Sequence, residues 1–190
     1  MSNTQEQYQT SGFLVVRNFC SRETAELMAE NLLLHKEVEV ANSGKYNMDT
    51  QVPNAYARYG LFDYALRFWA DKIGQYMGKQ LTPVNSYARI YEQGNTLVKH
   101  TDRPELQYNI SLCLRSDNIP WAFGITDFQG TDHLEYLNPG DALFYHGHLS
   151  HWREGAYQGN EMMQVFLHYC EKDSKYEKTK KFDGRKTLGI

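Results

Sequence analysis

From Pro83 onward the chain consists mainly of short segments of β-branched, aromatic and aliphatic residues, each bounded by a turn. The turns are rich in Gly, Pro and Asn, most clearly at 138–141, where the sequence reads Asn-Pro-Gly-Asp. Such a pattern predicts strands, which we expect at 86–91, 97–102, 108–114, 121–125, 134–137, 142–145 and 162–169. Many short strands preceded by helices favour a β-sandwich or a jelly roll backed by those helices.

The N-terminal part carries a helical period, apart from a short strand predicted at 13–16. Ser21 suits the N-cap of a helix whose apolar residues recur every three or four positions from Ala25 onward. The clearest amphipathic helix is expected at 61–77, ended by Gly78, and the polar stretch 41–51 predicts a loop or lid. We therefore expect one domain over 1–190, with helical support at about 20–78, a barrel at about 83–170 and a polar, solvated tail at 171–190.

The composition excludes several classes of protein. The net charge of −3 argues against a nucleic-acid or anionic-lipid partner, and the basic residues that gather in the last 20 are diluted by acidic ones, which favours a solvated tail. The cysteines are Cys20, Cys113 and Cys170, an odd number without a C-x-x-C pair, which fits a reducing compartment. Residues 1–10 are polar, unlike a signal peptide, and no run is long enough to span a bilayer. We expect a soluble, cytoplasmic protein; its oligomeric state is left open.

One pattern in the predicted barrel has the chemistry of a metal site. His100 and Asp102 are two positions apart, so that on a strand both side chains point to the same side. With one distant histidine they form the set that holds Fe(II) on one face, the 2-His-1-carboxylate triad. From residue types alone the third ligand stays open among His146, His148, His151 and His168. A surface histidine beside a solvated aspartate is the alternative interpretation of the pair.

The motifs around this pair resemble those of the 2-oxoglutarate/Fe(II)-dependent dioxygenases, particularly the prolyl-hydroxylase-like branch. Residues 91–102 follow Y-x-x-G-x-x-L-x-x-H-x-D, and 140–145 are similar to the G-D-A-L-x-F strand opening of that family. The resemblance implies a mainly β fold, the double-stranded β-helix, a jelly-roll or cupin-like barrel with N-terminal helices in support. It implies Fe(II) on His100, Asp102 and His151, with 2-oxoglutarate and O2 as co-substrates. Because Asp102 is kept, hydroxylation is favoured over halogenation.

The sequence departs from the family pattern at Glu161. Many members have Arg or Lys about ten residues after the distal histidine, where it binds the far carboxylate of 2-oxoglutarate, and a glutamate cannot do so. Arg153 follows His151 by two positions and Arg89 precedes Tyr91 by two, so either arginine is a candidate for the missing cation. The resemblance implies that Tyr91 donates a hydrogen bond to the co-substrate; a plain strand aromatic is the alternative.

The expected activity is hydroxylation of an unactivated C–H bond of a peptidyl side chain or a small metabolite, coupled to conversion of 2-oxoglutarate to succinate. Two other hypotheses remain: a cupin-like module that binds a metal and ligand without turnover, and a degenerate oxygenase fold used for protein binding. Succinate formation separates the enzyme from both. Asn109, on a strand expected to cross the barrel, either touches substrate or is satisfied by polar packing.

Overall fold

The structure, a computed structural model, describes residues 3–43, 55–57 and 60–189. Its strands are β1 (Phe13–Val16), β2 (Ala55–Ala57), β3 (Leu81–Glu92), β4 (Tyr108–Ser116), β5 (Phe123–Thr126), β6 (Asp132–Glu135), β7 (Ala142–His146), β8 (His151–Arg153) and β9 (Glu161–Glu171). Its helices are α1 (Asn3–Ser11), α2 (Arg22–Ser43), α3 (Gly60–Phe68), α4 (Ala70–Met77), α5 (Glu177–Lys180) and the 3-10 turn η1 (Lys181–Gly184).

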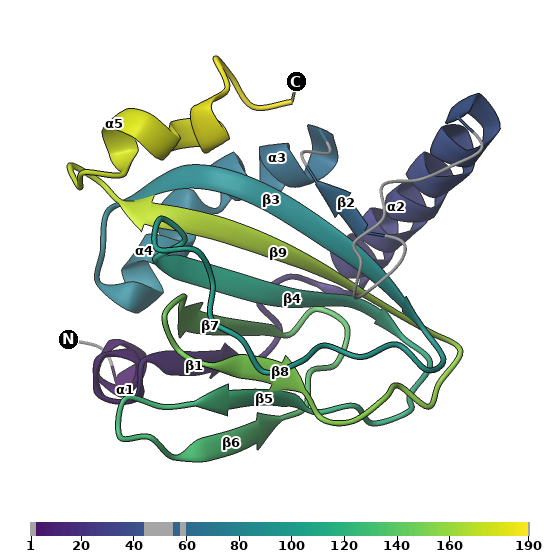
Figure 1. Cartoon of the computed structure of the whole chain (residues 1–190), viewed down its shortest axis with the longest axis horizontal. Helices are drawn as coiled ribbons and strands as arrows, with labels where there is room; N and C mark the ends of the chain where they lie inside the picture. Colours follow the sequence, from purple (N-terminus) through teal and green to yellow (C-terminus); the bar gives the residue numbers. More distant parts are fainter. Residues whose placement is uncertain (1–2, 44–54, 58–59, 190) are drawn as a thin grey trace.

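The strands form two antiparallel sheets. The larger has the order β1-β7-β4-β9-β3-β2, and the smaller has the order β6-β5-β8. One apolar core lies between the larger sheet and the helices, and a second lies between the two sheets. Figure 1 shows the helices gathered beside the larger sheet and the smaller sheet on its other side. The predicted jelly-roll architecture with helical support is confirmed.

Alternation along the strands sets which side chains enter the barrel. In β3, Ser86, Ala88 and Ile90 are fully buried toward the helical layer, while Tyr87 and Arg89 between them face the interior. Strand β9 is buried on both faces, because helices cover one and the smaller sheet covers the other. Register carries this alternation from strand to strand, so interior residues of β3, β9 and β4 stand in rows across the sheet.

Two predicted helix ends are confirmed, the N-cap at Ser21 and the stop at Gly78. The Thr24 backbone N–H donates to Ser21 Oγ at 3.1 Å, which caps α2. Gly78 ends α4 in the left-handed conformation, with φ at 68°.

The single helix predicted at 61–77 is wrong, because the chain breaks after Phe68 into α3 and α4. Tyr64 and Phe68 are 58% and 64% exposed and stack on each other instead of entering the core. The strand predicted at 97–102 is also absent, apart from one bridge between His100 and His151. Residues 41–43 of the predicted lid continue α2, and the rest of that lid lies outside the described residues.

No described residue of the polar segment 171–189 is buried, but the segment is anchored to the rest of the fold. Arg185 pairs with the buried Asp63 at 2.6 Å, and Leu188 packs against the core beneath the helices. Asp63 also accepts hydrogen bonds from Ser86 Oγ and the Gly189 backbone N–H. A buried carboxylate needs such partners, and this one lies 122 positions from Arg185 in the sequence.

Candidate metal centre and co-substrate pocket

Three side chains named from the sequence meet at the mouth of the barrel. His100, Asp102 and His151 each offer a ligand atom, and these atoms all lie within 4.8 Å of one another. His151 is the first residue of β8, and its backbone exchanges hydrogen bonds of 2.9 and 3.0 Å with that of His100. This antiparallel bridge holds the two imidazole rings with centroids 4.3 Å apart. Among the described residues this is the one group of three or more such side chains that could hold a metal ion.

In both histidines, a hydrogen bond at Nδ1 fixes the imidazole ring. His100 Nδ1 lies 2.8 Å from the Val98 carbonyl oxygen, and His151 Nδ1 lies 2.9 Å from the Leu149 carbonyl oxygen. Because a carbonyl oxygen only accepts, Nδ1 carries the proton in each ring and Nε2 keeps its lone pair for a metal. Burial, and then the neighbouring His100, lower the pKa of His151 to about 3, so this ring is neutral at physiological pH.

The carboxylate ligand is oriented by a neighbouring amide. Asn109 Nδ2 donates to Asp102 Oδ2 at 2.6 Å, and the same oxygen lies 3.6 Å from His151 Nε2. Asn109 is fully buried, and the polar contact that the structure gives its side chain is this one with a candidate ligand.

A hollow of about 60 Å³ opens beside the three candidate ligands. Its other walls come from β3, β7, β9 and the segment after β3, and they are Tyr87, Arg89, Leu97, Tyr145, Phe166 and His168. His168 Nδ1 lies 2.6 Å from Asn85 Oδ1, so this histidine is held at the edge of the site. His146 and His148 lie 4.1 Å apart by ring centroid but do not join the cluster.

Deeper in the barrel lies a buried cation. Arg153 follows His151 by two residues on β8, so both side chains point inward, and Arg153 is 3% exposed. Its Nη1 donates to the Trp121 carbonyl oxygen at 2.7 Å, and its guanidinium lies 4.8 Å from the Trp121 ring centroid. Its Nε and Nη2, together with Tyr91 Oη, are buried without a hydrogen-bond partner among the described residues. A buried cation with unused donors is costly, which makes Arg153 a candidate for binding an anionic group.

Solved structures of known function share this architecture. SnoK, a non-heme α-ketoglutarate-dependent carbocyclase from nogalamycin biosynthesis, has a TM-score of 0.69 at 12% identity, over 90% of this chain and 84% of its own. A Pseudomonas putida prolyl-4-hydroxylase has 0.68 at 13%, over 89% and 97%. HygX from Streptomyces hygroscopicus, with nickel and 2-oxoglutarate bound, has 0.67 at 13%, over 91% and 88%. No family model and no curated protein matches the sequence.

The chain has the fold of the non-heme 2-oxoglutarate-dependent enzymes. The resemblance drawn from the motifs is thereby confirmed at the level of fold, and the described chain includes a His-Asp-His group suited to iron.

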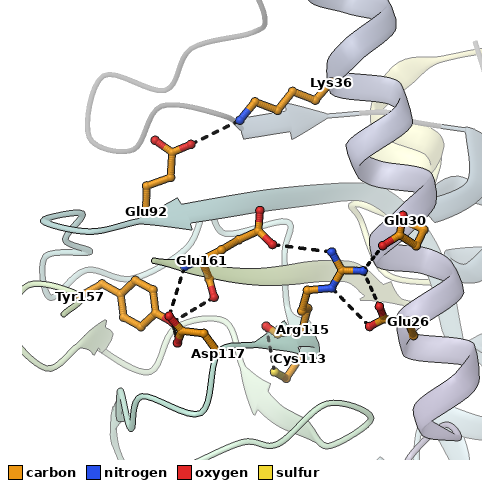
Figure 2. A network of polar contacts seen from close by, with 9 residues as sticks. All are labelled: Glu26, Glu30, Lys36, Glu92, Cys113, Arg115, Asp117, Tyr157 and Glu161. Atoms are coloured by element: carbon orange, nitrogen blue, oxygen red, sulfur yellow. Dashed lines mark hydrogen bonds and ion pairs between the residues drawn. The ribbon is translucent and has the colours of Figure 1, made fainter. Parts of the chain in front are cut away.

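Glu161 does not point into the barrel interior. On β9 the inward side chains are those of Met162 and Gln164, whereas Glu161 is about one-third exposed and lies 3.7 Å from Arg115 Nη1. Figure 2 shows Arg115 turned toward Glu161 on one side and toward Glu26 and Glu30 of α2 on the other. Glu161 is therefore part of an outer ion-pair network, and it leaves the interior free of negative charge at that point.

Around the site, Asn85, Ser111 and Gln164 carried no clear sequence signal, whereas Asn109 and His168 were named from the sequence. Asn85 and His168 stand in one interior row, because they are register partners on β3 and β9, and Asn109 on β4 extends that row. Deeper in the barrel, Gln164 Nε2 on β9 donates to Ser111 Oγ on β4 at 3.0 Å. Strand alternation would have placed each of these residues inside, but the row that they share depends on the register of three strands.

Proposed function

We propose that this protein is a 2-oxoglutarate- and Fe(II)-dependent oxygenase that hydroxylates an unactivated C–H bond. The balanced reaction converts the C–H substrate, 2-oxoglutarate and O2 into the hydroxylated product, succinate and carbon dioxide. The observation that carries the proposal is the convergence of His100, Asp102 and His151, with Nε2 of each imidazole left to ligate. Three ligands on one side of an ion leave the opposite positions open to co-substrates.

The iron would supply the site at which the 2-oxo acid and O2 are brought together and activated. His100, Asp102 and His151 would hold it, and Arg153 would bind the distal carboxylate of 2-oxoglutarate through Nε and Nη2. Tyr91 Oη is a second buried donor near this guanidinium, which lies 5.9 Å from the Tyr91 ring centroid. The aromatic rings of Trp121 and Phe123 beside Arg153 exclude water, so the ion pair would form in a low-dielectric setting.

The substrate is a peptidyl side chain or a small metabolite that enters beside Tyr87, Leu97 and Phe166, the apolar walls of the hollow. No described helix is long and apolar enough to cross a membrane. We also propose a cytoplasmic location, which fits the three cysteines, all of them unpaired.

Anaerobic addition of Fe(II) and 2-oxoglutarate tests the proposal. We expect a saturable visible charge-transfer band in the wild type and its loss in His100→Ala, whereas His148→Ala, a change at an exposed histidine outside the cluster, should keep it. Succinate should form when O2 is admitted. Bound iron with neither a band nor succinate would instead support the non-catalytic, cupin-like alternative.

A further inference from the structure

The Asp102 carboxylate is contacted by side chains from the larger sheet: Tyr145 on β7 hydrogen-bonds to it, and Asn109 holds it from the centre of the sheet. Asn109 lies on β4 between β7 and β9, where its register partners are Tyr145 and His168. Its backbone is therefore fixed by ladders on both sides, and its side chain is fully buried. From this rigid position Nδ2 donates to Asp102 Oδ2 at 2.6 Å.

The direction of the Asn109 amide is set by Asp102. Only the amide nitrogen can donate to a carboxylate, since the amide oxygen would repel it. Asn109 Oδ1 is left buried without a hydrogen-bond partner among the described residues. An unsatisfied buried acceptor costs free energy, so the orientation serves the carboxylate rather than the amide's own hydrogen bonding.

Gly147 makes room for this contact. A Cβ at position 147 would lie 1.8 Å from the Leu106 carbonyl oxygen and 2.8 Å from Asn109 Nδ2. The Gly147 carbonyl in turn accepts the Asp102 backbone N–H at 2.9 Å. Gly147, in the loop before β8, thus lies against both the Asp102 backbone and the Asn109 amide. It can do so because glycine has no side chain.

We infer that Asn109 is a positioning residue, which fixes the Asp102 carboxylate in the orientation that binds the metal. The inference rests on the proposed iron site. The two histidines are oriented by main-chain carbonyls, which substitution cannot remove, whereas the Asp102 carboxylate is oriented by side chains, with the Asn109 amide donating to it at 2.6 Å. Without the amide, the carboxylate rotates away from the ion more easily. Loss of such an outer partner typically weakens metal binding by about 10- to 100-fold.

The test is titration of the metal-free protein with Co(II), followed by its visible absorption, in Asn109→Leu and in the shorter Asn109→Ser. The matched control is Gln164→Leu, since Gln164 is an equally buried amide of the barrel interior that bonds to Ser111 instead of a candidate ligand. Circular dichroism establishes that each variant is folded, and Asn109→Ser serves alone if the leucine variant does not fold.

We expect the Co(II) dissociation constant to rise by about 10-fold or more in the Asn109 variants, with an altered absorption band, while Gln164→Leu stays within about threefold of the wild type. Smaller losses in the Asn109 variants, or an equal loss in Gln164→Leu, would overturn the inference alone. Absence of saturable Co(II) binding in the wild type would overturn both the inference and the proposed function.

Discussion

Replacement of Arg153 by Met should separate the function of this cation from its contribution to folding. Arg153 is buried beside Trp121 and Phe123 and uses one donor atom, Nη1, on the Trp121 carbonyl oxygen. Methionine keeps much of the volume and removes the charge. We expect opposite effects: 2-oxoglutarate binds far more weakly, while the free energy of unfolding without co-substrate stays the same or rises.

The magnitude follows from the two donors left over. Nε and Nη2 have no hydrogen-bond partner among the described residues and would both face the distal carboxylate. A hydrogen bond to a charged group contributes about 1.5–3 kcal/mol, so two contribute about 3–6 kcal/mol. At about 1.36 kcal/mol per factor of ten, affinity should fall by about 10²- to 10⁴-fold. Removal of the buried charge relieves a desolvation cost of several kcal/mol, which offsets the lost Trp121 hydrogen bond and aromatic contacts.

The assay is anaerobic titration of the Fe(II)-loaded protein with 2-oxoglutarate, paired with urea unfolding of the metal-free protein. Arg89→Met is the comparison, because Arg89 lines the hollow beside the candidate ligands and is the other cation considered. Arg115→Met controls for loss of an arginine in the outer network. Unchanged affinity in Arg153→Met together with a loss of more than about 2 kcal/mol in stability would show a structural cation and refute the reasoning. Loss of binding in Arg89→Met alone would transfer the role to Arg89.

Two further predictions concern stability. Burial lowers the pKa of His168 from 6.5 to about 4, so its contribution to metal-free stability is complete above about pH 6.5 and is lost as the pH falls toward 4. In urea unfolding, His168→Gln should reduce the pH slope in that window by about 1.4 kcal/mol per pH unit, and an unchanged slope would contradict this. Arg185→Met leaves the buried Asp63 carboxylate without its cation and should cost about 3–5 kcal/mol, against less than about 1 kcal/mol for the exposed Lys180→Met; equal losses would contradict the tethering of the C-terminal segment.

Local patterns predicted two helix ends correctly but did not predict where a helix is interrupted. Ser21 caps α2 and Gly78 ends α4 through contacts within a few residues, so both helix ends could be predicted from the sequence. The break after Phe68 was not, because the apolar residues of 61–77 share a helical period whether or not each finds a core to enter. The anchoring of the C-terminal segment was unpredictable for a related reason: its basic residues look alike in the sequence, and only the fold brings the buried Asp63 carboxylate to Arg185.

The sequence by itself determined the strand-rich architecture and the spacing that puts His100 and Asp102 on one side of an extended segment, since both follow from periods of two residues. Residue types alone left the third ligand open, and the family resemblance implied His151. The tertiary structure brings His151, and not His146, His148 or His168, into the cluster, because closure of the barrel brings distant strands together. The tertiary structure also decided that Glu161 joins an outer ion-pair network, and it buried Arg153, for which the two-residue spacing from His151 had already predicted an inward direction. The sequence gives the sign of each charge, but whether the side chain is exposed to solvent or buried depends on which neighbouring strand covers it.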